Sequence, residues 1–207
     1  MLIVVGGAAG MAAERLAQLD RVLAEWILPL LDRLGATVVD GGTDSGVMRV
    51  LGRARAAGQR RFPLVGVAAE GTVVLPDGPT PALPDAAHLE PHHTHTVLVP
   101  GSAWGDESPW LELVATVLAA GGRVATLLVN GGEISYADAA TGLDRGHQLV
   151  VAAGTGRAAD AVAAAAAAGP DPDTDPRALR IATAALTRIV DVGDGPGLVA
   201  AVESALA

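Results

Sequence analysis

The chain contains no cysteine and no lysine, and each absence excludes a class of site. Without cysteine there can be neither disulfides nor thiolate metal centres. Without lysine there is no P-loop of the form G-x-x-x-x-G-K-[ST], because that motif places its lysine on the phosphates. All 14 basic residues are arginines, and the formal charge of the 207 residues is -9. An acidic surface repels the nucleic-acid backbone, so we expect no nucleic-acid partner.

Long apolar runs are also missing. Half of the residues are hydrophobic, but no run approaches the roughly 18 residues that a membrane span needs. The opening MLIVV lacks the charged start and the cleavage site of a signal peptide, so we expect a strand there. These features predict a cytoplasmic protein with no membrane partner. The length favours one domain over residues 1–207.

Short apolar runs alternate with longer segments at helical spacing. Pro29 is expected to kink or end the first helix, and the proline-rich residues 75–92 and 169–176 are predicted to be loops. The predicted strands are 2–5, 36–40, 63–69, 96–100, 123–129, 148–153 and 188–192, and the predicted helices are 11–34, 45–57, 108–120, 133–142, 156–168, 177–187 and 196–206.

This alternation predicts the fold class. Strands that are apolar on both faces and alternate with helices form a parallel sheet covered on both sides. We therefore predict an α/β fold, a single Rossmann-like, doubly wound, mainly parallel sheet with helices on both faces. In such a sheet ligands bind beyond the carboxyl ends of the strands. Glycine-rich turns follow the first six predicted strands, and together they predict a glycine-lined cleft at that edge.

The stretch VVDGGTDSGVM, residues 38–48, has two interpretations. Gly42 and Gly46 can adopt positive φ, which suits a tight strand-to-helix turn with a purely structural role. The same loop, with Ser45 and the amides at the helix start, also suits the binding of a phosphate. Both interpretations stay open on this loop alone.

The stretch GTGRAAD, residues 154–160, repeats this pattern. Arg157 falls in the first turn of a predicted helix, where a cation opposes the helix dipole. A bound anion would compensate for that repulsion, whereas the alternative is an ordinary surface arginine. Trp104 lies in a loop, GSAWGDE, and either stacks on a nucleobase or packs over the domain. Trp110 stands at helical spacing and is predicted to be a core residue.

Four of the five histidines lie in HLEPHHTHTVLV, residues 88–99. His93 and His95 would share one face of a strand, so a metal site has to be considered. Apart from Glu90, no neighbouring residue completes a ligand set. We expect no metal and assign the histidines to hydrogen bonds at the start of the strand or toward a ligand.

Several of these motifs occur together, in the same order, in one known family. VVDGGTDSGVMRVLGRA, PLVGVAAEG, HTHTVLV, ATLLVNGGEIS and VVAAGTGRAAD resemble the amino-terminal cytosolic region of melastatin-type TRP channels and its stand-alone prokaryotic relatives. That group belongs to the SLOG superfamily. The likeness covers nearly the whole chain, from Val4 to the final helix. It implies binding and sensing of a nucleotide-derived ligand of the ADP-ribose or NAD-derived type, without a required cofactor.

The resemblance also implies which positions face the ligand. It further implies that an effector protein or a second copy of the chain is a possible partner. The expected ligand-binding positions are Gly6, Gly7, Gly42, Thr43, Ser45, Gly46, Val47, Trp104, Gly131, Gly132, Gly154, Thr155, Gly156 and Arg157.

An enzymatic branch of the superfamily offers the alternative function. The LOG branch hydrolyses the N-glycosidic bond of nucleotides and carries P-G-G-x-G-T-x-x-E after a strand. The matching turn here, VNGGEISYAD, keeps Gly131 and Gly132 but lacks the Gly-Thr pair and the glutamate. Glu133 follows the glycines directly and is the first, weak candidate for a catalytic carboxylate. Asp138 is the other carboxylate nearby, and neither residue is expected to have the spacing of the motif.

Overall fold

The computed structural model describes residues 1–7, 11–75, 78, 81, 83–169 and 171–207. The remainder of the first glycine-rich turn, residues 8–10, lies outside these ranges. The main sheet contains β1 (Leu2–Gly6), β2 (Val38–Asp40), β3 (Leu64–Ala69), β6 (His95–Val99), β7 (Ala125–Val129), β8 (Gln148–Ala153) and β9 (Thr187–Asp191). The helices are α1 (Ala13–Val22), the π-helical η1 (Leu23–Ile27), α2 (Leu28–Leu34), α3 (Gly46–Ala57), the short η2 (Glu70–Thr72), α4 (Ser108–Ala119), α5 (Glu133–Asp144), α6 (Arg157–Ala168), α7 (Pro176–Ala182) and α8 (Gly195–Leu206).

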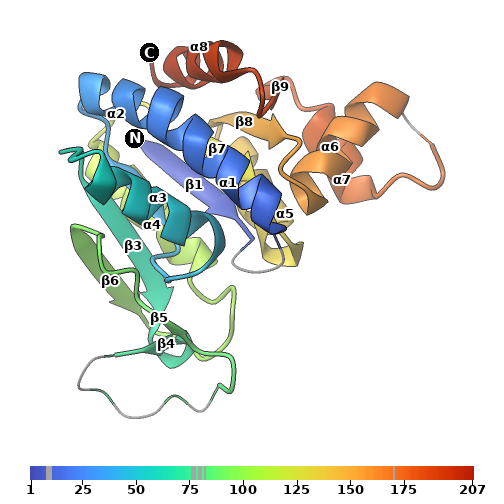
Figure 1. Ribbon diagram of the computed structural model, residues 1–207. Helices are drawn as coiled ribbons and strands as arrows, with labels where there is room; N and C mark the ends of the chain where they lie inside the picture. Colours follow the sequence, from blue (N-terminus) through green and yellow to red (C-terminus); the bar gives the residue numbers. More distant parts are fainter. Residues whose placement is uncertain (8–10, 76–77, 79–80, 82, 170) are drawn as a thin grey trace.

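The seven strands stand in the order β6-β3-β2-β1-β7-β8-β9, and every pairing among them is parallel (Figure 1). The chain builds outward from β1 to β6 and then returns to place β7 on the other side of β1. The strand order therefore reverses between β1 and β7. Such a switch point opens a crevice at the carboxyl ends of the two strands, where ligands of this fold class bind.

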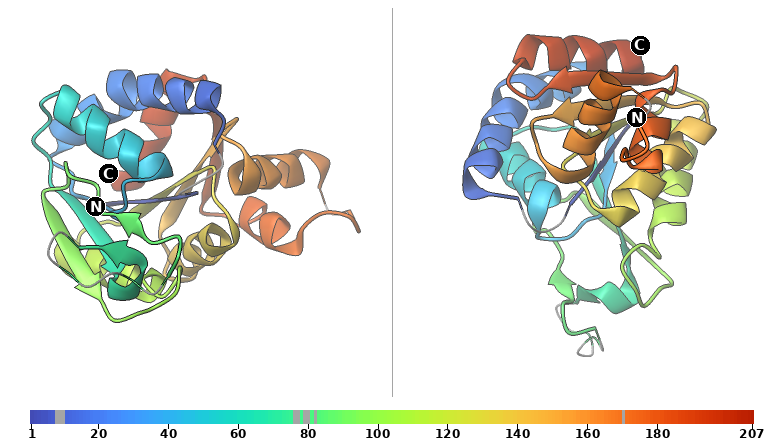
Figure 2. Two further views of the ribbon diagram at one scale, coloured as in Figure 1. Left: turned by 60° about the horizontal axis from the view of Figure 1, so that its bottom comes forward. Right: turned by 90° about the vertical axis from the view of Figure 1, so that its right-hand side faces the viewer.

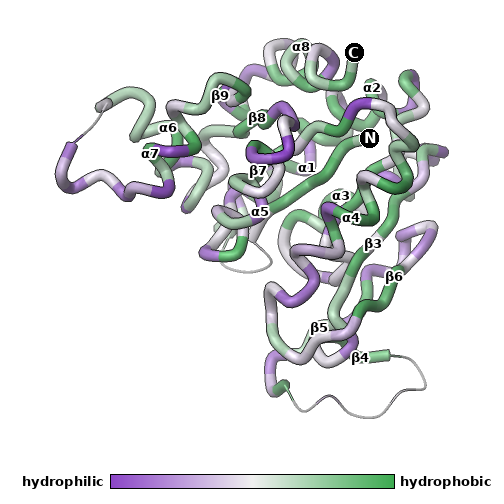
Figure 3. The backbone as a smooth tube through the Cα atoms, turned by 180° about the vertical axis from the view of Figure 1, so that it is seen from behind, coloured by the Kyte–Doolittle hydropathy of each residue, from purple (hydrophilic) through white to green (hydrophobic). Residues whose placement is uncertain are grey.

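Helices cover both faces of the sheet, as Figure 2 shows. On one face α1, η1, α2, α3 and α8 bury Leu2, Val4 and the alternate residues of the neighbouring strands. On the other face α4, α5, α6 and α7 bury Ile3, Val5 and the intervening residues. β3 is hydrophobic along most of its length (Figure 3), because both of its faces are buried. The predicted α/β fold with helices on both faces is confirmed.

Several local predictions need correction. The first helix does not stop at Pro29, because the π-helical segment Leu23–Ile27 precedes it and α2 continues to Leu34. The predicted helix 177–187 ends at Ala182. The predicted loop 75–92 contains β5 (Ala87–His88), which pairs in parallel with β4 (Val73–Val74). Trp110 was wrongly predicted to be a core residue, since 39% of it is exposed on α4.

None of the helices formed by the described residues is long and apolar enough to cross a membrane.

Candidate ligand-binding site

A cavity of about 510 Å³ opens at the carboxyl ends of β1 and β7. Its wall includes the ends of β1, the loop that follows β2, the start of α4 and the start of α5. Of the positions expected to face a ligand, those that line the cavity are Gly6, Gly7, Thr43, Ser45, Trp104, Gly132 and Arg157. Residues from distant parts of the sequence are thus brought together at the switch point.

Arg157 supplies the cationic side of the cavity. A β-carbon on Gly132 would lie 2.7 Å from its Nη2, and one on Gly7 would lie 3.2 Å from its Nη1. The guanidinium therefore lies over two bare glycine backbones that follow β7 and β1. Arg157 itself has a φ of +46°, a backbone conformation that is rare for an arginine and is often found at functional sites.

Two helices begin at the cavity with unused amides. The N–H groups of Gly46, Val47 and Met48 at the start of α3 donate no hydrogen bond to any described residue. The same holds for Glu133 and Ile134 at the start of α5. Ser45 in front of α3, and Gly132 to Ser135 in α5, line the cavity. N–H groups without an acceptor among the described residues, together with the helix dipoles, favour an anion here.

The start of α6 differs from the expectation for the glycine-arginine loop. Its first amides are already bonded, because Ala159 N–H donates to the Asn130 carbonyl at 2.9 Å and Ala158 N–H to the Gly131 carbonyl at 3.3 Å. Gly154 N–H donates to Asp160 at 2.7 Å. The Thr155 hydroxyl donates to the Ala152 carbonyl at 2.6 Å and accepts from Asn130 N–H at 2.7 Å. This loop therefore reaches the cavity through the Arg157 side chain.

The remaining expected positions also serve packing. A β-carbon on Gly42 would lie 2.8 Å from the Gly66 Cα. The two backbones can approach this closely only because both residues are glycine. Val47 is fully buried in the core. Gly131 has a φ of +93°, and a β-carbon there would lie 2.8 Å from Ser135 Cβ. Gly46, Gly154 and Gly156 also have positive φ. The expected positions that are not part of the cavity wall are Gly42, Gly46, Val47, Gly131, Gly154, Thr155 and Gly156.

Carboxylates occupy the side of the cavity formed by α4 and α5. Burial raises the pKa of Asp138 to about 6, although a hydrogen bond from Ser108 opposes the shift. Burial also raises the pKa of Glu107, which accepts a hydrogen bond from Gly105 N–H at 3.0 Å. Glu107, Ser108 and Asp138 all line the cavity. Asp138 is therefore suited to exchange a proton near neutral pH.

Glu133, the first carboxylate considered for catalysis, has different surroundings. Its side chain is 79% exposed and forms an ion pair with Arg177, which stacks 4.5 Å above the Tyr136 ring. The hydrogen bond from Arg177 lowers the pKa of Glu133. A carboxylate that is exposed, paired and more acidic than usual is poorly suited to act as a general acid.

At this edge the sequence analysis was wrong about one residue, Asp138, and missed another, Asn130. Asp138 stands six positions after Gly132, as the glutamate does in P-G-G-x-G-T-x-x-E, so a count along the motif would have found it. Asn130 follows β7 with a φ of +56° and is 1% exposed. Within the described part of the chain, neither its amide nitrogen nor its amide oxygen has a hydrogen-bond partner. Buried amides are nearly always bonded, so this one needs an explanation.

Trp104 lies in the cavity wall, and its indole N–H donates to Asp85 at 3.1 Å. The side chain is only partly buried, which leaves part of the ring available at the cavity.

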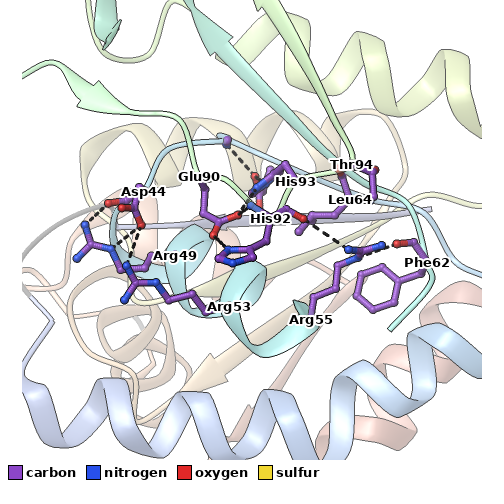
Figure 4. Close-up of polar contacts among 12 residues, drawn as sticks. Asp44, Arg49, Arg53, Arg55, Phe62, Leu64, Glu90, His92, His93 and Thr94 are labelled. Atoms are coloured by element: carbon purple, nitrogen blue, oxygen red, sulfur yellow. Dashed lines mark hydrogen bonds and ion pairs between the residues drawn. The ribbon is translucent and has the colours of Figure 1, made fainter. Parts of the chain in front are cut away.

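The histidines form hydrogen bonds rather than a cluster of metal ligands. His93 bonds to Asp40 at 2.8 Å and to Glu90 at 2.9 Å, and His92 bonds to Glu90 at 2.6 Å (Figure 4). His95 bonds to the Thr94 hydroxyl at 2.9 Å. Within the described ranges, no group of three or more histidine, aspartate or glutamate side chains is arranged to hold a metal ion.

A family model described as "SLOG in TRPM, prokaryote" matches residues 1–201. The chain belongs to this SLOG family. No protein of curated function matches it in sequence. The family assignment agrees with the resemblance drawn from the glycine-rich motifs, and it applies to the whole sheet and all of the cavity wall.

Two solved structures are similar to this SLOG chain at low sequence identity. One is the molybdenum cofactor carrier protein of Chlamydomonas reinhardtii, with a TM-score of 0.59, 16% identity and coverage of 99% of this chain and 96% of that one. Another is the molybdenum cofactor binding protein of Rippkaea orientalis, with a TM-score of 0.48, 10% identity and coverage of 72% and 73%. The first likeness supports the fold, and the ligand of this chain has to be argued from its own residues.

Proposed function

We propose that this SLOG protein binds and senses a nucleotide-derived ligand, of the ADP-ribose or NAD-derived type, in the cavity at the carboxyl ends of β1 and β7. The observation that carries the proposal is the Arg157 guanidinium over Gly7 and Gly132, beside the open amides of α3 and α5. A diphosphate needs such a combination of a cation and backbone N–H donors. A volume of about 510 Å³ falls in the range of small-molecule sites.

The other half of the cavity complements the rest of such a ligand. The Cα of Asp138 lies about 9 Å from that of Gly132 along the α5 axis, since a helix rises about 1.5 Å per residue over the six positions between them. Its carboxylate and that of Glu107 accept hydrogen bonds from hydroxyl groups, as a ribose would offer. Trp104 presents an indole suited to stacking with a base. A phosphate at one end and a sugar or base at the other would match this polarity.

Calorimetry with ADP-ribose, cyclic ADP-ribose, NAD and AMP tests the proposal. We expect saturable binding of at least one of these compounds to the purified protein. If none of them binds, and if purified protein also carries no nucleotide detectable by mass spectrometry, the proposal fails. The cavity would then belong to a protein that acts through protein contacts alone.

The position of Asp138 favours a second candidate function, hydrolysis of an N-glycosidic bond. In that reaction the base leaves C1′ with the bonding electron pair, and water supplies a hydroxyl to C1′. A carboxyl group that titrates near pH 6 can take the proton of that water or donate one to the leaving base. Incubation with AMP or NAD, followed by chromatography for free base, tests this function.

The hydrolase candidate predicts different effects for the two carboxylates. Asp138→Asn should abolish release of the base, whereas Glu133→Ala should leave it nearly unchanged, because Glu133 is exposed and paired with Arg177. No release by the wild-type protein over long incubation, under conditions in which it binds the same nucleotide, would leave sensing without hydrolysis.

A further inference from the structure

A buried imidazole joins two carboxylates behind the loop that follows β2. The Nε2 of His93 lies 2.8 Å from Asp40 Oδ1, and its Nδ1 lies 2.9 Å from Glu90 Oε2 (Figure 4). The side chain of His93 is 1% exposed, and those of Asp40 and Glu90 are fully buried. These three residues, named here the His93 cluster, come from β2 and from the segment that leads into β6.

This geometry requires a proton. A neutral imidazole has one N–H donor and one bare nitrogen, which can only accept. A carboxylate oxygen also only accepts, so a neutral ring would leave one of the two short contacts without a hydrogen. Both contacts become hydrogen bonds when His93 is an imidazolium between two ionised carboxylates.

The two carboxylate residues of the cluster also hold the cavity loop. Gly42 N–H donates to Asp40 Oδ1 at 2.7 Å, and Glu90 N–H donates to the Gly42 carbonyl at 2.9 Å. Beyond Gly42, Asp44 N–H donates to the His88 carbonyl at 2.7 Å, and Thr43 forms a bridge with Leu89. The middle of the loop, residues 42–44, is therefore attached to residues 88–90.

The helix that follows the loop is attached as well. A β-carbon on Gly52 in α3 would lie 2.1 Å from Glu90 Oε2, so the carboxylate occupies the space that the missing side chain leaves. Gly41, Thr43, Ser45 and Met48 line the cavity. The His93 cluster thus fixes both the loop and the helix that form one wall of the proposed site.

We propose that His93, protonated between Asp40 and Glu90, is the positioning residue of the 41–45 loop, so that ligand affinity falls when His93 loses its proton. This inference rests on the proposed ligand-binding function. Two other titratable or charged groups lie around the cluster. His92 is hydrogen-bonded to Glu90, and Arg55 of α3 donates from its Nη1 to the His92 carbonyl at 3.5 Å. Arg49 and Arg53 of α3 pair with Asp44 in the loop, and the neighbouring residue of β3 is the uncharged Gly66.

Burial disfavours the charged ring, but the hydrogen bonds and charges of Asp40 and Glu90 outweigh it and raise the pKa of His93. A raised histidine pKa adds stability that is complete at low pH and is lost as the pH rises through the folded-state value. The loop should therefore be well ordered at neutral pH and should loosen on the alkaline side of the His93 titration.

A titration of the ligand-free wild-type protein tests the inference without reference to any ligand. Nitrogen-15 spectra of the histidine rings should show both nitrogens of His93 protonated at neutral pH. The amide resonances of Gly42, Thr43 and Asp44 should shift with the same midpoint as the His93 ring. A neutral His93 at pH 7, or loop amides that stay unchanged while His93 titrates, would overturn the proposal. Because no variant at His93 is needed, this result does not depend on whether His93→Gln folds.

Calorimetry across the same pH range tests the effect on affinity. ADP-ribose should bind at least about tenfold more weakly above the His93 titration than below it, as expected when the competent loop falls to about a tenth of the population. His95→Gln is the matched control, because His95 is exposed and bonds only to the Thr94 hydroxyl, and it should keep the wild-type pH profile. His93→Gln should bind weakly with little pH dependence.

The outcomes separate the two proposals. Equal affinity on both sides of the titration, in protein that circular dichroism shows to be folded, refutes the role of His93 while binding itself stands. No binding of ADP-ribose, cyclic ADP-ribose, NAD or AMP at any pH refutes the proposed function. The pH titration of the loop amide resonances then still tests whether protonated His93 orders the loop.

Discussion

Replacing Asn130 with glycine separates a ligand-binding role from a structural one. Asn130 has a φ of +56° and a buried side-chain amide that finds no partner among the described residues. Glycine adopts this backbone conformation without strain, so Asn130→Gly removes the amide and leaves the backbone free to keep its path. The backbone bonds to Thr155 and Ala159 do not involve the side chain and should survive.

The expected magnitudes follow from this geometry. An unsatisfied buried amide costs about 1–3 kcal/mol, and the extra freedom of glycine in the unfolded chain costs about 0.5–1 kcal/mol. The ligand-free variant should therefore be as stable as the wild type or more stable, by up to about 2 kcal/mol. For a chain of this size, 1 kcal/mol shifts the melting temperature by roughly 2–4 °C. If the amide bonds to the ligand, affinity should fall about tenfold, or about 1.4 kcal/mol.

Differential scanning calorimetry and ligand titration measure the two quantities on the same samples. Ala120→Gly is the matched control, because Ala120 also has a positive φ of 49° and lies exposed at the end of α4, away from the cavity. It should change stability slightly and affinity not at all. A melting temperature well below that of the wild type, together with unchanged affinity, would show that the Asn130 amide serves the fold and would refute the reasoning.

Three further predictions concern the cavity wall. Arg157→Ala should weaken ADP-ribose binding by about 1.5–3 kcal/mol, the value of a charged hydrogen bond, while calorimetry shows no such loss for the exposed Arg188→Ala. Gly132→Ala should weaken binding similarly without unfolding the protein, because its β-carbon would lie 2.7 Å from the mobile Nη2 of Arg157; unchanged affinity would mean that the guanidinium position is unimportant. Asp138→Asn should raise the unfolding free energy by about 3 kcal/mol above pH 6 and by much less at pH 4, because burial raises the pKa of Asp138 from 3.8 to about 6 and the wild type must ionise a buried acid on the alkaline side. Denaturant unfolding at both pH values checks the last prediction, which a gain of equal size at both would contradict.

Periodicity and glycine placement predicted the fold well, because these features act locally. Every strand of the main sheet lies within or close to a predicted apolar run. The strands are apolar at successive positions because both faces of the sheet are buried. The errors lie where tertiary contacts decide. Propensity alone cannot place a π-helical turn before Pro29, and it cannot tell that the apolar face of α4 leaves Trp110 exposed.

The site was harder to predict than the fold. The sequence shows that Arg157 and the glycines follow strands, but it does not show where each amide finds its acceptor. The first amides of α6 bond to the carbonyls of Asn130 and Gly131, whereas those of α5 stay open, and this difference depends on how two loops meet in space. The joining of Asp40 to His93, 53 residues apart, is likewise a product of the strand order. Asp138, by contrast, could have been found by counting.

The division of the cavity into a guanidinium side and a carboxyl side has a consequence for selectivity. In the proposed site, a phosphate in the middle of the ligand would lie at Arg157. The hydroxyl groups of a sugar at its end would lie at Asp138. A dinucleotide with an additional phosphate on that ribose would bring like charges together at Glu107 and Asp138. The chain should therefore discriminate NAD from its 2′-phosphorylated counterpart by charge repulsion.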